Sequence, residues 1–195
     1  MEERLIKVGI THGDINGIGY EVILKTFSDA RVAELCTPVI YGSSKIAAYH
    51  RKALELPPVN MNIISQAEDA GINRVNIINC VDDETKVELS QSTSIAGEAA
   101  FLALEAAVTD LKRGAVDVLL TAPINKHNIQ NYQFHFPGHT EYLEERFGGV
   151  GRKALMILMK DGLRVALVTG HIPLSEVPSK ITVEDIVSKL RIFNQ

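Results

Sequence analysis

Two histidines occupy positions that are typical of catalytic or ligand-binding groups in α/β enzymes. His139 lies in the segment Pro137–Glu141, directly before a helical pattern, and His171 follows the apolar run Val165–Thr169. A third polar segment, Thr121–Lys126, also follows an apolar run. Because ligands in open α/β sheets bind beyond the carboxyl ends of the strands, these segments predict one site assembled from several loops.

Three of the candidate side chains have both a structural and a functional interpretation. Lys126 either neutralises a phosphate or a developing negative charge, or it is a solvated lysine in the first turn of a helix, where the helix dipole disfavours a cation. His139 is either a substrate contact or a loop histidine beside Thr140, which would then cap the next helix. Asp14, in the glycine-rich turn Gly13–Gly19, is either a cap or a substrate contact.

His171 is placed to bind a metal ion or to act as an acid or base, because it follows a strand expected to be buried. One histidine does not hold a metal firmly, since zinc takes three or four protein ligands. Further ligands would come from His139, from carboxylates, from a partner chain or from sequence beyond Gln195. Cys36 and Cys80 are in no Cys-x-x-Cys motif, which argues against a cysteine zinc site.

The elements that position these side chains alternate between β-rich runs and helical patterns, which predicts an α/β fold with a mostly parallel sheet flanked by helices. Asp161-Gly162 predicts an antiparallel hairpin, and the polar stretch 82–92 is expected to be a long loop or a charged edge strand. We expect strands at 5–10, 38–41, 62–64, 75–79, 116–120, 154–159 and 165–169, and helices at 18–27, 44–54, 94–113, 140–147 and 183–193.

Composition excludes several classes of protein. The 195 residues are 46% hydrophobic and 23% charged, as in an ordinary globular domain, and the net charge of −4 argues against a nucleic-acid partner. No apolar run approaches the ~20 residues that span a bilayer, so no membrane association is expected. The charged amino-terminal segment does not resemble a signal peptide, and the expected location is the cytoplasm.

Four segments, taken in order, resemble the motifs of the 4-hydroxythreonine-4-phosphate dehydrogenase (PdxA) family. Ile10–Glu21 resembles the family's opening Gly-Asp-Pro-Ala-Gly-Ile-Gly-Pro-Glu, and Thr121–Lys126 resembles Thr-Gly-Pro-x-x-Lys. Gly138–Glu141 matches Gly-His-Thr-Glu, and Val165–Leu174 resembles Val-Ala-Leu-x-Thr-Thr-His-x-Pro-Leu. Their order and spacing make the resemblance specific. The sequence departs from the family motifs at several positions, such as Gly170 in place of a threonine. These changes affect which substrate fits, but not the type of reaction.

The resemblance implies a metal-dependent dehydrogenase that uses NAD or NADP in vitamin B6 biosynthesis. It would oxidise and decarboxylate 4-phosphohydroxy-threonine to 3-amino-2-oxopropyl phosphate. His139 and Thr140 would contact this small phosphorylated substrate, and His171 would be one ligand of a zinc, magnesium or cobalt ion. The resemblance also implies a two-domain architecture like that of isocitrate and isopropylmalate dehydrogenases, and a homodimer with the site at its interface. The alternatives are a related sugar-acid 4-phosphate dehydrogenase and a non-catalytic truncated relative.

The resemblance covers the first part of a family member. In the family, two further metal ligands lie in later Asn-Pro-His and His-Asp-Gln segments, and most residues that bind NAD also lie there. Neither segment occurs in this sequence. We therefore expect residues 1–195 to be the N-terminal portion of a longer enzyme, a little over half of it, and to be inactive alone.

Overall fold

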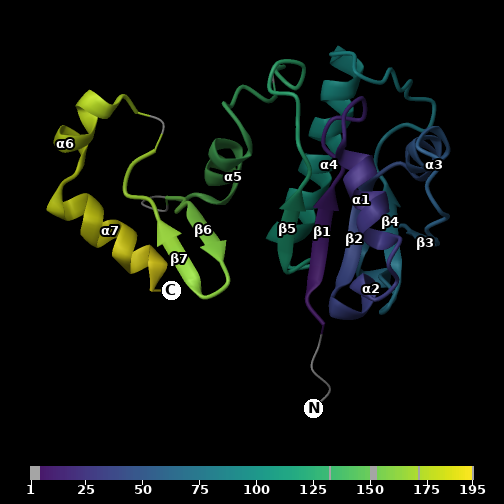
Figure 1. The fold of residues 1–195 in the computed structure, drawn as a ribbon, viewed down its shortest axis with the longest axis horizontal. Helices are drawn as coiled ribbons and strands as arrows, with labels where there is room; N and C mark the ends of the chain where they lie inside the picture. Colours follow the sequence, from purple (N-terminus) through teal and green to yellow (C-terminus); the bar gives the residue numbers. More distant parts are fainter. Residues whose placement is uncertain (1–4, 132, 150–152, 171, 195) are drawn as a thin grey trace. The chain divides into compact units, whose positions relative to one another are not determined.

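Five parallel strands form the central sheet of the first of two units, Met1–Arg146, in the order β3-β4-β2-β1-β5 (Figure 1). The structure is a computed structural model that describes residues 5–131, 133–149, 153–170 and 172–194. The strands are β1 (Lys7–Thr11), β2 (Thr37–Gly42), β3 (Met61–Ile64), β4 (Val75–Asn79) and β5 (Val118–Thr121). The helices of this unit are α1 (Gly19–Phe27), α2 (Val32–Leu35), α3 (Ser44–Ala53), α4 (Ser94–Lys112) and α5 (His139–Phe147, which ends at the boundary with the second unit), with a short 3-10 turn at Ala67–Asp69.

The register of the sheet brings the ends of β1 and β5 together. Thr11, the last residue of β1, pairs with Tyr41 of β2 on one side and with Thr121, the last residue of β5, on the other. All of these pairings are parallel, so the carboxyl ends of the strands lie at one edge of the sheet. The loops after β1 and β5 therefore start from adjacent points.

Helices cover both faces of the sheet. Alternate residues of a strand point to opposite faces. Ile40 of β2 packs with Ile23 and Phe27 of α1, whereas its neighbour Tyr41 packs with Ala103 of α4. α1 and α4 thus lie on opposite faces, and α3 packs beside α1. This two-sided cover explains why β2 is buried along its whole length.

α4 shows how local sequence fixes an element. The hydroxyl of Thr93 accepts a hydrogen bond from the backbone N–H of Ala96 and caps the helix. The face towards the sheet carries small side chains, which permit a close approach. At the other end Gly114 takes φ +75°, the left-handed conformation that glycine adopts at little cost after a helix.

The second unit, Phe147–Gln195, contains the antiparallel hairpin β6 (Ile157–Lys160) and β7 (Leu163–Ala166). Asp161, at φ +51°, makes the turn with Gly162, and Lys160 pairs with Leu163. A 3-10 turn (Leu174–Glu176) and the helices α6 (Val177–Lys180) and α7 (Val183–Phe193) follow. Among its described residues, none is fully buried.

The predicted α/β class, the parallel sheet, the hairpin and the long helices are confirmed. Stretch 82–92 is a loop, so the alternative of an edge strand is wrong. The prediction that 165–169 is a buried strand is also wrong, because β7 ends at Ala166 and its side chains are largely exposed. β6 and β7 form a two-stranded sheet, and within the described residues of this unit no helix or sheet buries its side chains. No helix in the described part of the chain is long and apolar enough to cross a membrane.

Candidate functional site

Three segments meet at the carboxyl edge of the sheet. They are the turn after β1, the loop after β5 and the start of α5. The backbone N–H of Asp14 donates to the carbonyl oxygen of Pro123 at 2.9 Å, which ties the first segment to the second. The turn after β1 and the loop after β5 therefore lie side by side at this edge. That His139, His171 and Thr121–Lys126 form one site stays a prediction.

Asp14 joins these two loops through its side chain as well. One carboxylate oxygen accepts the backbone N–H of Asn16 at 2.8 Å, and the other accepts the side-chain amide of Asn128 at 3.0 Å. The side chain is buried. Asp14 thus has the structural role that the sequence left open, and a direct contact with substrate stays a prediction.

Gly13 makes the close contact between the loops possible. It takes φ +71°, and a Cβ at this position would lie 2.2 Å from the carbonyl oxygen of Pro123. Gly19 is equally confined, since a Cβ there would lie 1.9 Å from the carbonyl oxygen of His12. Backbone proximity alone therefore requires glycine at both positions.

Asn16 anchors the long loop 82–92, a role that the sequence analysis missed. Its side-chain NH2 donates to the carbonyl oxygen of Gln91 at 2.9 Å and to the hydroxyl of Thr93 at 3.1 Å. Its side-chain oxygen accepts the backbone N–H of Glu88 at 2.7 Å. Asparagine in a glycine-rich turn is a common signal for such side-chain bonds, but the partner, more than seventy residues away, has no local signal.

A stack of aromatic rings lies beneath the turn after β1 and was also missed. The ring of Tyr20 stacks on His12 at 5.1 Å between centroids and on His50 at 5.2 Å. Burial lowers the pKa of His12 to about 4, so its imidazole is neutral at pH 7. The phenol of Tyr20 accepts the backbone N–H of Ser43 at 2.9 Å. The stack thereby joins β1, α1 and α3 behind the turn.

Lys126 lies in a turn over residues 126–129, not in the first turn of a helix, which one of its two interpretations required. The side-chain oxygen of Asn125 accepts the backbone N–H groups of His127 and Asn128 and shapes this turn. The ammonium group of Lys126 is exposed and has no ion-pair partner in the part of the chain that the structure describes. It lies 3.9 Å from the position that a Cβ on Gly138 would take, beside the start of α5.

His139 is the first residue of α5 and is half-buried. Burial, and after it the positive charge of Lys126, lowers the pKa of its imidazole. Its Nε2 atom is shielded from solvent and has no hydrogen-bond partner among the described residues. Since an unsatisfied buried polar atom costs about 1–3 kcal/mol, this nitrogen is a natural contact for a polar ligand.

α5 is held in place by its contacts with α4. The phenol of Tyr142 donates to a carboxylate oxygen of Glu105 at 2.8 Å, and Arg146 forms an ion pair with the same carboxylate. The ring of Tyr142 also packs against Phe101 and Phe134. These contacts fix the helix start, and with it His139.

Thr140 is the second residue of α5 and is exposed, so it is not the N-cap that one interpretation required.

His171 lies outside the described residues, and its predicted role as a metal ligand stays a prediction. Among the residues that the structure describes, no group of three or more histidine, cysteine or acidic side chains could hold a metal ion. The described side chains alone therefore do not fit a complete divalent-metal site. They also do not identify an NAD-binding site.

Comparison with known proteins identifies the family of the chain. The sequence model of the family described as "Pyridoxal phosphate biosynthetic protein PdxA" matches residues 34–195. A 4-hydroxythreonine-4-phosphate dehydrogenase from Bacteroides thetaiotaomicron is 59% identical over 195 residues, which are 100% of this chain and 53% of that protein. A protein of the same name from Sulfurihydrogenibium sp. is 39% identical, over 98% of this chain and 58% of its own length.

Solved structures show the same fold. The crystal structure of 4-hydroxythreonine-4-phosphate dehydrogenase from Klebsiella pneumoniae superimposes with a TM-score of 0.87 at 23% identity, over 100% of this chain and 59% of that one. The chain spans a little over half the length of these relatives. From the family match and the identity to its relatives together, the chain belongs to the PdxA family of pyridoxal phosphate biosynthetic proteins.

Proposed function

We propose that this chain forms part of a dehydrogenase that converts 4-phosphohydroxy-threonine to 3-amino-2-oxopropyl phosphate, with NAD or NADP as the hydride acceptor, in pyridoxal phosphate biosynthesis. Names of close relatives support the substrate and the reaction class. The structural observation that carries the proposal is the pairing of Lys126 with His139. A cation and a neutral imidazole with an unbonded nitrogen lie beside each other at the carboxyl edge of the sheet.

These residues match the chemistry of the substrate. Lys126 offers a positive charge to the phosphate or the carboxylate. Thr140, which follows His139 in the sequence, offers an exposed hydroxyl. His139 contributes a hydrogen bond from or to Nε2, because a neutral imidazole is a donor at one nitrogen and an acceptor at the other. Oxidation of the substrate's 3-hydroxyl gives a β-keto acid, which loses carbon dioxide readily. The nicotinamide cofactor supplies the hydride acceptor when it is bound.

We also propose that the enzyme depends on a divalent metal ion such as zinc, magnesium or cobalt. His171 would be one of its ligands, and the other ligands would come from outside residues 1–195. Homodimerisation, with a shared site at the interface, belongs to the same proposal. The many apolar side chains exposed on the second unit support an assembly larger than the isolated chain.

NADH formation by the complete protein tests the proposal. With a divalent metal and 4-phosphohydroxy-threonine, we expect NADH to accumulate, and we expect a chelator to abolish it. A four-carbon sugar-acid 4-phosphate, which lacks the amino group, serves as the second substrate. A higher kcat/KM for that compound would show that it, and not 4-phosphohydroxy-threonine, is the substrate. No reduction of NAD or of NADP with either compound would refute the reaction class. The isolated 195-residue chain should give none.

A further inference from the structure

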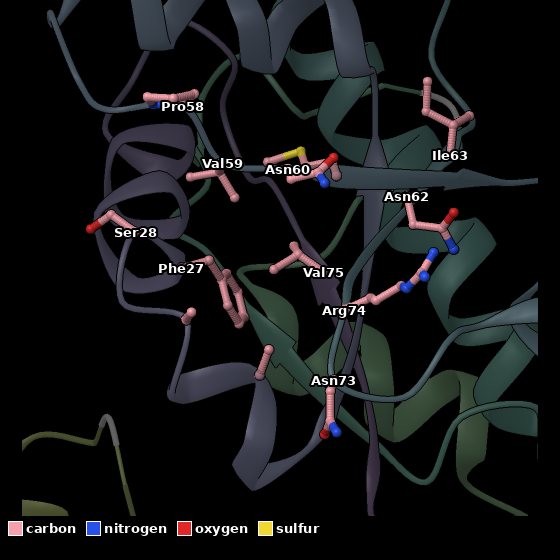
Figure 2. Close-up of a pocket in the computed structure, with 13 residues that line it drawn as sticks. Phe27, Ser28, Pro58, Val59, Asn60, Asn62, Ile63, Asn73, Arg74 and Val75 are labelled. Atoms are coloured by element: carbon pink, nitrogen blue, oxygen red, sulfur yellow. The ribbon is translucent and has the colours of Figure 1, made fainter.

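A pocket opens at the opposite edge of the sheet from the loops that carry Asp14 and Lys126. It lies at the amino ends of β3 and β4 and has a volume of about 750 Å³ (Figure 2). The end of α1, α2 and the segments that lead into the two strands form its walls. Small-molecule sites are typically clefts of roughly 300–1,000 Å³, so this pocket has room for a small organic ligand.

The floor of the pocket is apolar. Phe27, Ala33 and Val75 are almost completely buried there, and Val59 and Met61 are half-buried beside them. Figure 2 shows Phe27, Val59 and Val75 around the same space. This floor suits a ligand with an apolar or aromatic group, because burial of such a group against apolar side chains is favourable.

The wall on the strand side is polar and positively charged. The guanidinium of Arg74 has no hydrogen bond or ion pair among the described residues, and the side-chain amides of Asn60 and Asn73 likewise have no partner there. Among the described residues that line the pocket, none is acidic. Arg74 thus offers an unpaired guanidinium, a group that binds carboxylates and phosphates, and Asn60 and Asn73 offer amide donors elsewhere on the lining of the same pocket.

A buried asparagine fixes this polar wall in advance. The side-chain NH2 of Asn76, fully buried in β4, lies 3.0 Å from the carbonyl oxygens of Pro38, Gly71 and Arg74. Its oxygen accepts the side-chain amide of Asn62 and the backbone N–H of Gly71, both at 2.9 Å. Binding therefore does not need to order the turn that carries Arg74, which lowers the cost of binding.

We propose that this pocket is a second ligand site, which takes a small organic anion: a carboxylate or phosphate ester that carries an apolar group. The anion contacts Arg74 and Asn60, and the apolar group lies on Phe27 and Val75. The site is separate from the proposed dehydrogenase site and does not depend on the proposed function.

Titration of the 195-residue chain with phenyl phosphate, benzoate and neutral benzyl alcohol, followed by NMR of the backbone amides, tests the proposal. We expect saturable shifts at the amides of Asn60 and Arg74 with at least one anion, and binding about ten-fold weaker or worse with benzyl alcohol. The anion that binds more tightly identifies the ligand as a phosphate ester or a carboxylate. Neither anion shifting these amides would overturn the proposal.

Two substitutions distinguish specific binding in this pocket from a general attraction of anions to the protein. Arg74→Gln removes the guanidinium, and Asn60→Asp places a carboxylate on the wall at an exposed position. Each should weaken binding of the tighter anion by about ten-fold or more. The matched controls, Arg164→Gln and Asn194→Asp, change exposed side chains of the second unit and should leave binding unchanged. Equal binding by the pocket variants and the controls would also overturn the proposal.

Discussion

His139 combines two properties that a substrate-orienting histidine needs. Burial keeps its imidazole neutral, and an unbonded Nε2 remains to contact a ligand. The position of Lys126 adds to the first property, since a nearby cation disfavours a second positive charge on the ring. The loop after β5 therefore lies beside the start of α5 and, through the charge of Lys126, also lowers the pKa of His139.

The coupling between these two residues can be measured directly. Replacement of Lys126 by methionine removes the cation, so we expect the pKa of His139 to rise towards its ordinary value. NMR titration of the imidazole protons reports this pKa. Lys160→Met, which removes an exposed cation in the second unit, is the matched control and should have no effect. An unchanged pKa in Lys126→Met would show that the two side chains are not close in solution.

His12 predicts a pH dependence of stability. Its pKa falls from 6.5 in the unfolded chain to about 4 in the folded one, so the unfolded state binds the proton between these values. The stability that the folded chain has with a neutral His12 is complete above pH 6.5 and is lost as the pH falls towards 4. Between about pH 7 and pH 5 the loss amounts to about 2 kcal/mol.

His12→Phe keeps a ring in the stack but cannot titrate. Urea unfolding followed by far-UV circular dichroism at both pH values should give a smaller loss of stability on acidification for His12→Phe than for the parent chain. The difference should approach about 2 kcal/mol. Equal losses in the two proteins would mean that His12 is not held neutral by burial.

At the scale of elements, the turn after β1 is positioned by contacts with three other segments. Asp14 bonds to the loop after β5, Asn16 holds the loop 82–92, and the Tyr20 stack supports the turn from below. The glycines permit the backbone approach on which these contacts depend. Loss of one such contact should therefore weaken the edge of the sheet that carries the candidate site.

Gly13 and Gly114 form a natural matched pair for this claim. Both have positive φ, +71° and +75°, but a Cβ on Gly13 would clash with the carbonyl oxygen of Pro123, whereas a Cβ on Gly114 would meet nothing within 4 Å. Gly114→Ala should cost about 1–2 kcal/mol from conformation alone. Gly13→Ala should cost at least about 2 kcal/mol more, as measured by urea unfolding. Similar costs would show that the two loops are not in tight contact.

Periodicity and turn residues were enough to predict most elements, because β2, α4 and α7 carry clear local patterns, whereas the patterns of β3 and β4 are weaker. The rule that ligands bind beyond the carboxyl ends of parallel strands singled out the loop that carries Lys126, but the contact of this loop with the turn at Asp14 was not predicted. The stack of His12, Tyr20 and His50 could not be predicted, since it depends on packing between distant segments. The exposed β7 could not be predicted either, because a local apolar run does not show what covers it.

At the scale of the whole molecule, the two units differ in how they bury apolar surface. The first unit has a core on both faces of its sheet. In the second unit, no described residue is fully buried, and α7 leaves Leu190 and Phe193 exposed. Helices with little packing have low local stability, since propensity alone stabilises short helices only marginally.

Hydrogen exchange should therefore separate the two units in the isolated 195-residue chain. We expect the amides of α7 to exchange close to the rate of an unfolded peptide, and those of β1 and β2 to be protected up to the global free energy of unfolding. Mass spectrometry of exchanged peptides resolves this difference. Protection of α7 as strong as that of β2 would contradict the picture of an uncovered second unit.

The proposed function depends on Lys126 and His139 being part of the substrate site. The most direct test is the kcat/KM for NADH formation from 4-phosphohydroxy-threonine by the complete protein with His139→Gln, compared with the exposed neighbour variant His127→Gln. We predict a fall of about 100-fold or more for His139→Gln and almost no change for His127→Gln. Equal activity of the two variants would contradict the assignment of this edge of the sheet as the active site.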